Sequence, residues 1–510
     1  MKTIRLAGIL VALVAVAPIG SANVAAQRQA APATVLPPAL RDSLRARFKV
    51  MMDSGNVASL SWAVTRGGKI IWEDAIGYAD LERQIPATPN TRYSMASISK
   101  PIHATGIMRL VEMGKVDLDR PANDYLGGGK ITGLAGDASG ATIRRLLAHT
   151  AGLPLHYRFF YEGGTVQRPT MDEAINRYAI TVYPPGKVYN YSNLGYGVLD
   201  EVIARASGQT AEEFMRQEVF APLGLPSATV GTGSGLENAA LRYDANRKPI
   251  APYDFDHRGA SAVYISAHDL VRFGMFHLKD RLKDQRPILT DQRLDEMHRV
   301  QTPGDTATGY GLGWAINYEQ GYRVVSHTGG MPGVSTTLKL FPEEDVAIAV
   351  LANGSAIAPH RAVFHLAGAV LPRYNAAAQE RAAGGGGPAG MTAPPSLWGE
   401  WTGTVRTYDG KTTPLALRIE SANVQVRLGA GPNALWTLLN GPSWRNNLLG
   451  GRFMGTIPSD EARRFPHSIG ISLWLDGGKL QGWAAALTTD EPITGAMSSY
   501  AELTKVAARP

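Results

Sequence analysis

Residues 94–105 read SMASISKPIHAT, and within this stretch Ser97 and Lys100 stand three residues apart. On a helix, that spacing brings the hydroxyl and the amine to one face, one turn apart. Pro101 suits a first helical turn, where a missing N–H does little harm, and apolar or small residues recur at about helical spacing as far as Met113. Because a serine hydroxyl attacks only when a neighbouring base takes its proton, this Ser-x-x-Lys stretch predicts an activated serine nucleophile at the start of a helix.

Two further polar tripeptides follow in chain order. They are Tyr191-Ser192-Asn193 and His327-Thr328-Gly329, the second followed by Gly330. The first supplies a phenol and a carboxamide, and the second a polar strand edge with two glycines. Each signal alone is weak, because patterns this short recur by chance. Their order and wide spacing together favour an acyl-transferring serine hydrolase.

Two flanking stretches strengthen this interpretation: residues 146–153 read LLAHTAGL, and residues 310–314 read YGLGW. With the three motifs, they resemble the penicillin-recognising serine hydrolase superfamily, in the branch of class C β-lactamases, D-alanyl-D-alanine carboxypeptidases, D-aminopeptidases and related esterases. The resemblance covers roughly residues 35–373. It implies an α+β, β-lactamase/transpeptidase-like domain, in which an antiparallel sheet flanked by helices and a helical lobe enclose the active site. It does not choose one activity within the superfamily.

The resemblance also implies roles for the matching positions. Ser97 would form the acyl-enzyme, with Lys100 and Tyr191 beside it, and the choice of base between these two stays open. The backbone N–H groups of Ser97 and Gly330 would form the oxyanion hole. The expected substrate-binding residues are Asn193, His327, Thr328, Gly329 and Gly330. His149, within the first flanking stretch, is expected to be buried and structural.

Two positions depart from the β-lactamase pattern. Class C β-lactamases usually have Tyr-Ala-Asn and Lys-Thr-Gly, whereas this chain has Ser192 and His327 in place of the alanine and the lysine. A histidine with an ordinary pKa is mostly neutral above pH 7, so it attracts the carboxylate of a penicillin more weakly than lysine does. We therefore expect slow or no turnover of β-lactams.

Composition excludes several other classes of function. The chain has no cysteine, which rules out disulfides and thiolate metal sites. Its histidines lack metal-binding spacing, and we expect no metal and no cofactor. The net charge of +7 comes without runs of like charge, so nothing indicates nucleic acid. The expected partner is a small-molecule or short-peptide substrate, with peptidoglycan-derived peptides among the candidates.

The sequence predicts four regions. They are a signal peptide (1–26), the hydrolase domain (35–373), a flexible Gly/Ala/Pro linker (374–396) and a β-rich C-terminal domain (397–510). The short apolar run of the first region follows basic residues and precedes small ones, which is typical of a secretory signal. We therefore expect a periplasmic or secreted protein that is not an integral membrane protein after cleavage, with an uncleaved anchor as the alternative.

Strand patterns divide into two groups. Within the hydrolase domain, strands are expected early and late in the sequence with helices between them, which suggests one sheet assembled from distant segments. Beyond the linker, apolar residues alternate at period two in residues 415–419, 424–428 and 469–475, and residues 476–479 read as a tight turn. We predict a small all-β sandwich or barrel there, with its tryptophans in the core rather than at a ligand.

Three functions remain open from sequence alone. The first is an active hydrolase that cleaves an amide or an ester through an acyl-enzyme. The second is a class C-like β-lactamase, and the third is a catalytically silent member of the fold that binds a ligand. Intact Ser97, Lys100, Tyr191 and Asn193 favour the first. The role of the C-terminal domain and the oligomeric state stay open.

Overall fold

The computed structural model describes residues 35–356, 358–384, 393–421, 423–488 and 495–506. The predicted signal peptide at 1–26 and residues 385–392 of the predicted linker lie outside the described residues. In the described part of the chain, no helix combines the length and the apolar character needed to cross a bilayer.

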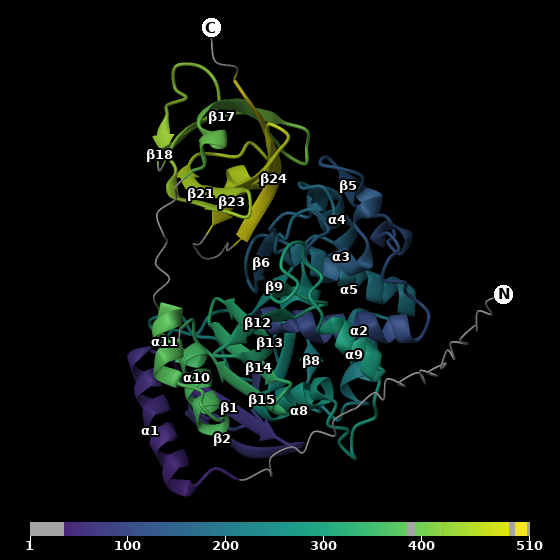
Figure 1. Cartoon of the computed structure of the whole chain (residues 1–510), viewed down its shortest axis with the longest axis vertical. Coiled ribbons are helices and arrows are strands. Elements are labelled where there is room, and N and C mark those ends of the chain that lie inside the picture. The colour runs from purple at the N-terminus through teal and green to yellow at the C-terminus, as the bar shows by residue number, and fades with distance from the viewer. Residues whose placement is uncertain (1–34, 357, 385–392, 422, 489–494, 507–510) are drawn as a thin grey trace, which may run out of the picture.

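An antiparallel sheet of eight strands forms the centre of the N-terminal domain (Figure 1). Its order is β11-β12-β13-β14-β15-β1-β2-β3. Early and late segments of the sequence therefore pair in one sheet, which confirms the predicted α+β arrangement. The strands are β1 (Ser59–Arg66), β2 (Lys69–Asp80), β3 (Ile85–Pro86), β11 (Gly309–Tyr310), β12 (Ala315–Glu319), β13 (Tyr322–Met331), β14 (Val334–Phe341) and β15 (Val346–Ala352).

Helices cover both faces of this sheet. Successive side chains of a strand point to opposite faces, so Trp62 packs with Phe48 of α1 (Pro38–Ser54) and with α10 (Ala358–Val370). The next residue, Ala63, belongs to the core on the other face, with α8 (Ala267–Leu278). The ring centroids of Phe48 and Trp62 lie 5.0 Å apart, edge to face. Because both faces are buried, the central strand β15 (VAIAVLA) is apolar throughout rather than alternating.

The segment between the two groups of strands forms a helical lobe beside the sheet (Figure 1). Its helices are α2 (Ser99–Glu112), α3 (Ile143–Leu147), α4 (Met171–Tyr178), α5 (Asn193–Ser207), α6 (Ala211–Met215), α7 (Arg258–Ser261) and α9 (Asp291–Met297). Its short strands are β4 (Arg92–Ser94), β5 (Thr132–Gly133), β6 (Tyr157–Tyr161), β7 (Ile180–Thr181), β8 (Thr229–Val230), β9 (Tyr253–Phe255) and β10 (Val263–Ser266). The helix predicted after Ser97 is α2, and a 3-10 turn at Ala96–Ile98 leads into it.

The C-terminal domain is an antiparallel, nearly closed barrel-like sheet, as predicted. Its strand order is β19-β18-β17-β16-β24-β23-β22-β21-β20. The strands are β16 (Gly399–Arg406), β17 (Thr412–Glu420), β18 (Asn423–Leu428), β19 (Thr437–Leu438), β20 (Asn440–Arg445), β21 (Leu448–Met454), β22 (Ser468–Asp476), β23 (Lys479–Thr488) and β24 (Gly495–Lys505). The predicted tight turn joins β22 to β23, and both of its central residues, Gly477 and Gly478, have positive φ.

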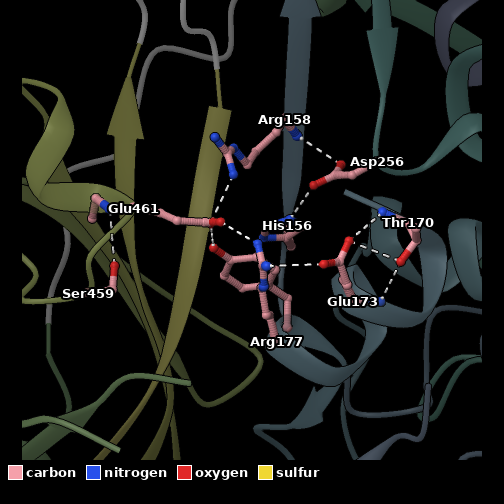
Figure 2. A network of polar contacts seen from close by, with 10 residues as sticks. His156, Arg158, Thr170, Glu173, Arg177, Asp256, Ser459 and Glu461 are labelled. Carbon is pink, nitrogen blue, oxygen red and sulfur yellow. Dashed lines mark hydrogen bonds and ion pairs between the residues drawn. The ribbon is translucent and has the colours of Figure 1, made fainter. Parts of the chain in front are cut away.

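The two domains are in direct contact. β24 pairs with β6 of the helical lobe, so the barrel sheet continues into the N-terminal domain. Glu461 reaches across, 2.9 Å from Arg158 Nη1 and 2.6 Å from Arg177 Nη1, and accepts a hydrogen bond from the Tyr178 hydroxyl (Figure 2). A buried charge is tolerated only when it is paired, so this contact holds the domains in a defined arrangement.

Two details differ from the sequence-based expectation. The first half of the predicted linker forms a helix, α11 (Ala376–Gly384), which is rich in alanine, a strong helix former. Trp401 is buried in the core, as expected for the tryptophans, but Trp474 and Trp483 pack against residues of the helical lobe instead.

Candidate active site

The three motifs meet where the sheet, α2 and α5 come together. Ser97 lies in the turn before α2, its predecessor Ala96 has a φ of 47°, and Lys100 follows in the first turn of the helix. A buried alanine in the left-handed region is strained, and such strain is typical of functional sites. The Lys100 amine lies 3.1 Å from Ser97 Oγ, so the predicted nucleophile and base are in hydrogen-bond contact.

Lys100 is fully buried. Its Nζ donates to Asn193 Oδ1 at 2.7 Å and to the carbonyl oxygen of Ala260 at 3.3 Å. Burial lowers the pKa of Lys100 well below its usual range. A neutral amine has two N–H donors and one lone pair. With the two donors directed to Asn193 and Ala260, the lone pair is left for the proton of Ser97.

Tyr191 lies on the other side of the lysine, whose Nζ is 4.7 Å from the centre of the phenol ring. Burial raises the pKa of Tyr191 well above its usual value, and a hydrogen bond with Ser97 lowers it by less. His149 is buried, and its ring centroid lies 4.3 Å from that of Tyr191. Its Nδ1 accepts a hydrogen bond from the backbone N–H of Ser192 at 3.1 Å, so His149 supports the loop that carries Tyr191.

His327 is buried on β13 beside the cavity. Its Nδ1–H donates to the carbonyl oxygen of Thr328 at 2.7 Å, and its Nε2 accepts from the Tyr310 hydroxyl at 2.8 Å. This pattern matches the neutral ring. Burial, and to a smaller extent Lys100, lowers the pKa of His327 to about 3. His327 is therefore uncharged at neutral pH.

The two glycines of β13 have different surroundings. A Cβ at Gly329 would lie 2.2 Å from the carbonyl oxygen of Met95 and 2.3 Å from Thr336 Oγ1. A Cβ at Gly330 would meet no atom of the described residues within 4 Å, and Gly330 lines the cavity. Packing therefore requires the first glycine, while the second keeps the cavity side of the strand open to a ligand.

A cavity of about 1050 Å³ opens in front of these residues. The predicted site residues that line it are Ser97, Tyr191, His327, Thr328 and Gly330. Further lining comes from the loops around Lys187 and Asp305 and from four residues of the C-terminal domain. Among the described residues, no group of three or more histidine, aspartate or glutamate side chains is arranged to hold a metal ion.

A serine and a lysine one turn apart, between an antiparallel sheet and a helical lobe, together with a tyrosine and an asparagine at the lysine, define the penicillin-recognising serine hydrolase superfamily. The model of the β-lactamase family matches residues 44–370. This match covers more than half of the chain, and the chain therefore belongs to the β-lactamase family.

Individual relatives are more distant. The chain is 26% identical to penicillin-binding protein 4* of Bacillus subtilis over 310 residues, which are 56% of this chain and 66% of that protein. It is 28% identical to penicillin-binding protein 4 of Amycolatopsis lactamdurans over 333 residues, which are 60% of this chain and 84% of that protein. The solved structure of SurE with D-Leu has the same fold, with a TM-score of 0.59 and 22% identity over 92% of this chain and 100% of that one.

Sequence reasoning missed several residues at this site. Tyr310 was noticed only as part of a flanking stretch, although its hydroxyl lies 2.8 Å from Nε2 of His327, whose tautomer is set by the Thr328 carbonyl at Nδ1. The backbone carbonyl of Ala260 contacts Lys100, and the identity of a side chain does not indicate where its backbone carbonyl will lie. The residues of the C-terminal domain at the cavity also carried no signal, because only the docking of two domains brings them there.

Proposed function

We propose that the protein is an exported active-site serine hydrolase that cleaves an amide or an ester through an acyl-enzyme on Ser97. The observation that carries this proposal is the environment of Lys100. The amine is buried and, among the described residues, contacts no carboxylate; it has two acceptors for its two N–H groups and Ser97 Oγ for its lone pair. A lysine held neutral in this way can act as a general base at neutral pH.

In the acylation step, Ser97 Oγ would attack the carbonyl carbon of the substrate while its proton passes to Lys100 Nζ. The backbone N–H groups of Ser97 and Gly330 would stabilise the oxyanion. Collapse of the tetrahedral intermediate breaks the bond to the leaving group, which takes the proton back from Lys100. Water then attacks the ester on Ser97, with Lys100 again as the base, and releases the acid.

Between the two candidate bases, the surroundings favour Lys100. Burial lowers the pKa of the lysine, whereas it raises the pKa of Tyr191. A tyrosinate is therefore the less accessible base at neutral pH. The neutral Tyr191 hydroxyl, hydrogen-bonded to Ser97, would orient the nucleophile and pass the proton of Lys100 on to the leaving group.

Among the substrate classes, an ordinary amide or ester is favoured over a β-lactam. The site lacks the fixed positive charge that a lysine in place of His327 would supply, and burial keeps His327 neutral. At this position of β13, recognition of a lactam carboxylate would therefore rest on hydrogen bonds rather than on charge. A silent ligand-binding role is disfavoured because Ser97, Lys100, Tyr191 and Asn193 are all present and in contact.

The test is hydrolysis of p-nitrophenyl butyrate by the purified wild type and by Ser97→Ala. We expect saturable hydrolysis by the wild type and a loss of about 10³-fold or more in the variant, since nucleophile and base act as a unit. Thermal unfolding of both proteins controls for folding. Equal rates for the two proteins would refute the proposal. Detection of the processed protein outside the cytoplasmic membrane would test export, which rests on residues 1–26.

A further inference from the structure

The C-terminal domain forms part of the wall of the catalytic cavity. Four of its residues, Asn446, Asn447, Leu448 and Trp474, line the same cavity as Ser97. They come from the turn between β20 and β21 and from the neighbouring strand β22. A domain that served only to stabilise the fold or to bind elsewhere would not need residues at this position.

The turn is built to be rigid. Asn446 and Asn447 are its two central residues, with φ of 51° and 62°. A two-residue hairpin with a type I′ turn needs positive φ at both positions, and asparagine tolerates this conformation. The carbonyl of Asn447 accepts a hydrogen bond from the N–H of Leu475 at 3.0 Å, and Leu448 lies directly opposite Trp474 in the β21–β22 register. The four lining residues therefore form one fixed surface.

Contacts with the helical lobe hold this surface in place. Leu448, Trp474 and Trp483 pack against a small apolar cluster of the lobe around Tyr183. The Tyr183 hydroxyl donates to the carbonyl of Ser472 at 2.8 Å. These contacts involve the segment that leads directly to Tyr191 and Asn193.

Two further contacts complete the attachment. Trp483 Nε1 donates to Asn190 Oδ1 at 3.2 Å, next to Tyr191. Farther from the cavity, Glu461 bonds to Arg158, Arg177 and Tyr178 (Figure 2). With the pairing of β24 and β6, these contacts attach the barrel to the helical lobe and place its turn at the cavity that Ser97 lines.

The chemistry of the surface indicates what it binds. Within the described part of the chain, the exposed side-chain amides of Asn446 and Asn447 make no hydrogen bond, so they are available to a ligand. Leu448 and Trp474 add an aliphatic and an aromatic contact. The surface carries no charge, and the charged cavity residues Lys187 and Asp305 both belong to the hydrolase domain. Carboxamides recognise the N–H and C=O groups of a peptide, while an indole packs on an apolar side chain.

We propose that Asn446, Asn447, Leu448 and Trp474 form a substrate subsite for the peptide-like part of an extended acyl donor, an uncharged chain of amides with an apolar side chain. This proposal rests on the proposed serine hydrolase function and names the class of substrate for it. The cavity volume of about 1050 Å³ is at the upper end of the usual range of ligand sites and exceeds what a simple ester would fill.

The test compares two p-nitrophenyl esters with the same leaving group, p-nitrophenyl acetate and the ester of N-acetyl-phenylalanyl-D-alanine. The wild type is expected to have the higher kcat/KM for the peptide ester. Trp474→Ala should lower kcat/KM for the peptide ester by about fivefold or more and leave the acetate within twofold, because only the peptide ester reaches the subsite. Trp436→Ala, in the same domain and away from the cavity, should change neither.

A second variant covers the case in which Trp474→Ala unfolds the domain. Replacing both Asn446 and Asn447 by glycine keeps the positive φ and removes only the carboxamides. It is expected to have the same selective effect. Equal loss with both esters, or no loss with the peptide ester, would overturn the subsite. If neither ester is hydrolysed in a Ser97-dependent way, the proposed function fails instead, so the two failures are distinguishable.

Discussion

The substitution Gly329→Ala tests how far catalysis depends on the close packing of β13 against the segment that leads to Ser97. The added Cβ would lie 2.2 Å from the Met95 carbonyl and 2.3 Å from Thr336 Oγ1. These two groups are joined by a hydrogen bond of 2.9 Å, and Gly329 is the direct partner of Thr336 in the β13–β14 register. The new methyl group would therefore press on the segment that leads to Ser97 and on the neighbouring strand at once.

The overlap sets the size of the effect. To restore ordinary contact, β13 and the residues before Ser97 must separate by about 1 Å, and a misplacement of that size typically costs about 10²-fold in rate. The two oxyanion donors proposed here, the N–H groups of Ser97 and Gly330, lie on opposite sides of this gap. We expect kcat for p-nitrophenyl butyrate to fall about 10²-fold, with a loss of about 1–3 kcal/mol in the free energy of unfolding from overpacking.

Gly330→Ala is the matched control. In the described part of the chain, its Cβ would meet no atom within 4 Å, so the free energy of unfolding should not change. Steady-state hydrolysis and thermal unfolding of both variants give the comparison. A Gly329→Ala enzyme with kcat within twofold of the wild type and unchanged stability would refute the proposed contact between β13 and the nucleophile segment.

Five further outcomes follow from the same geometry. Lys100→Met should lower kcat about 10²–10⁴-fold in ester hydrolysis, the usual contribution of a general base, and a variant at wild-type rate would exclude Lys100 from that role. In a pH–rate profile, kcat/KM should fall on the acidic side as the pH drops through the lowered pKa of Lys100, where the amine gains a proton. On the alkaline side, kcat/KM should stay constant up to about pH 10, because the pKa of Tyr191 is raised. His327, with a pKa of about 3, should add no step between about pH 5 and 8, and a step that disappears in His327→Gln would contradict the neutral ring. Nitrocefin should be turned over slowly or not at all, and saturable turnover at enzyme-like rates would contradict this prediction. Glu461→Ala should cost about 3–5 kcal/mol of unfolding free energy by leaving the buried Arg158 unpaired, and urea unfolding that matches the wild type would show that the pair contributes nothing.

Much of the fold could be predicted because local patterns agree with the tertiary structure. Pro101 and the apolar spacing after it predicted a helix that corresponds to α2. The two glycines at 477–478 predicted a tight turn, which joins β22 to β23. Period-two alternation marked the barrel strands because one face of each is in a core. The first half of the linker was misjudged, since the glycines that follow obscured an alanine-rich stretch, which forms α11.

The sequence predicted those site residues whose side chains carry the chemistry. It missed the groups that belong to the site only through their position in the folded chain. The short motifs contain Ser97, Lys100 and Tyr191, which the structure brings into contact. The base could not be chosen from sequence, because the choice depends on burial, which lowers one pKa and raises the other. Trp474 was expected in the core for a similar reason. A large apolar side chain in a β-rich region usually packs in the core, and only the docking of the barrel brings Trp474 to the cavity.

Intact-mass spectrometry of the enzyme, quenched with acid during turnover of p-nitrophenyl butyrate, tests the central claim most directly. The account predicts a single butyryl adduct on the wild type, mapped by peptide digestion to Ser97 and absent from Ser97→Ala. Ester turnover that proceeds equally well in Ser97→Ala, or an adduct on another residue, would contradict it.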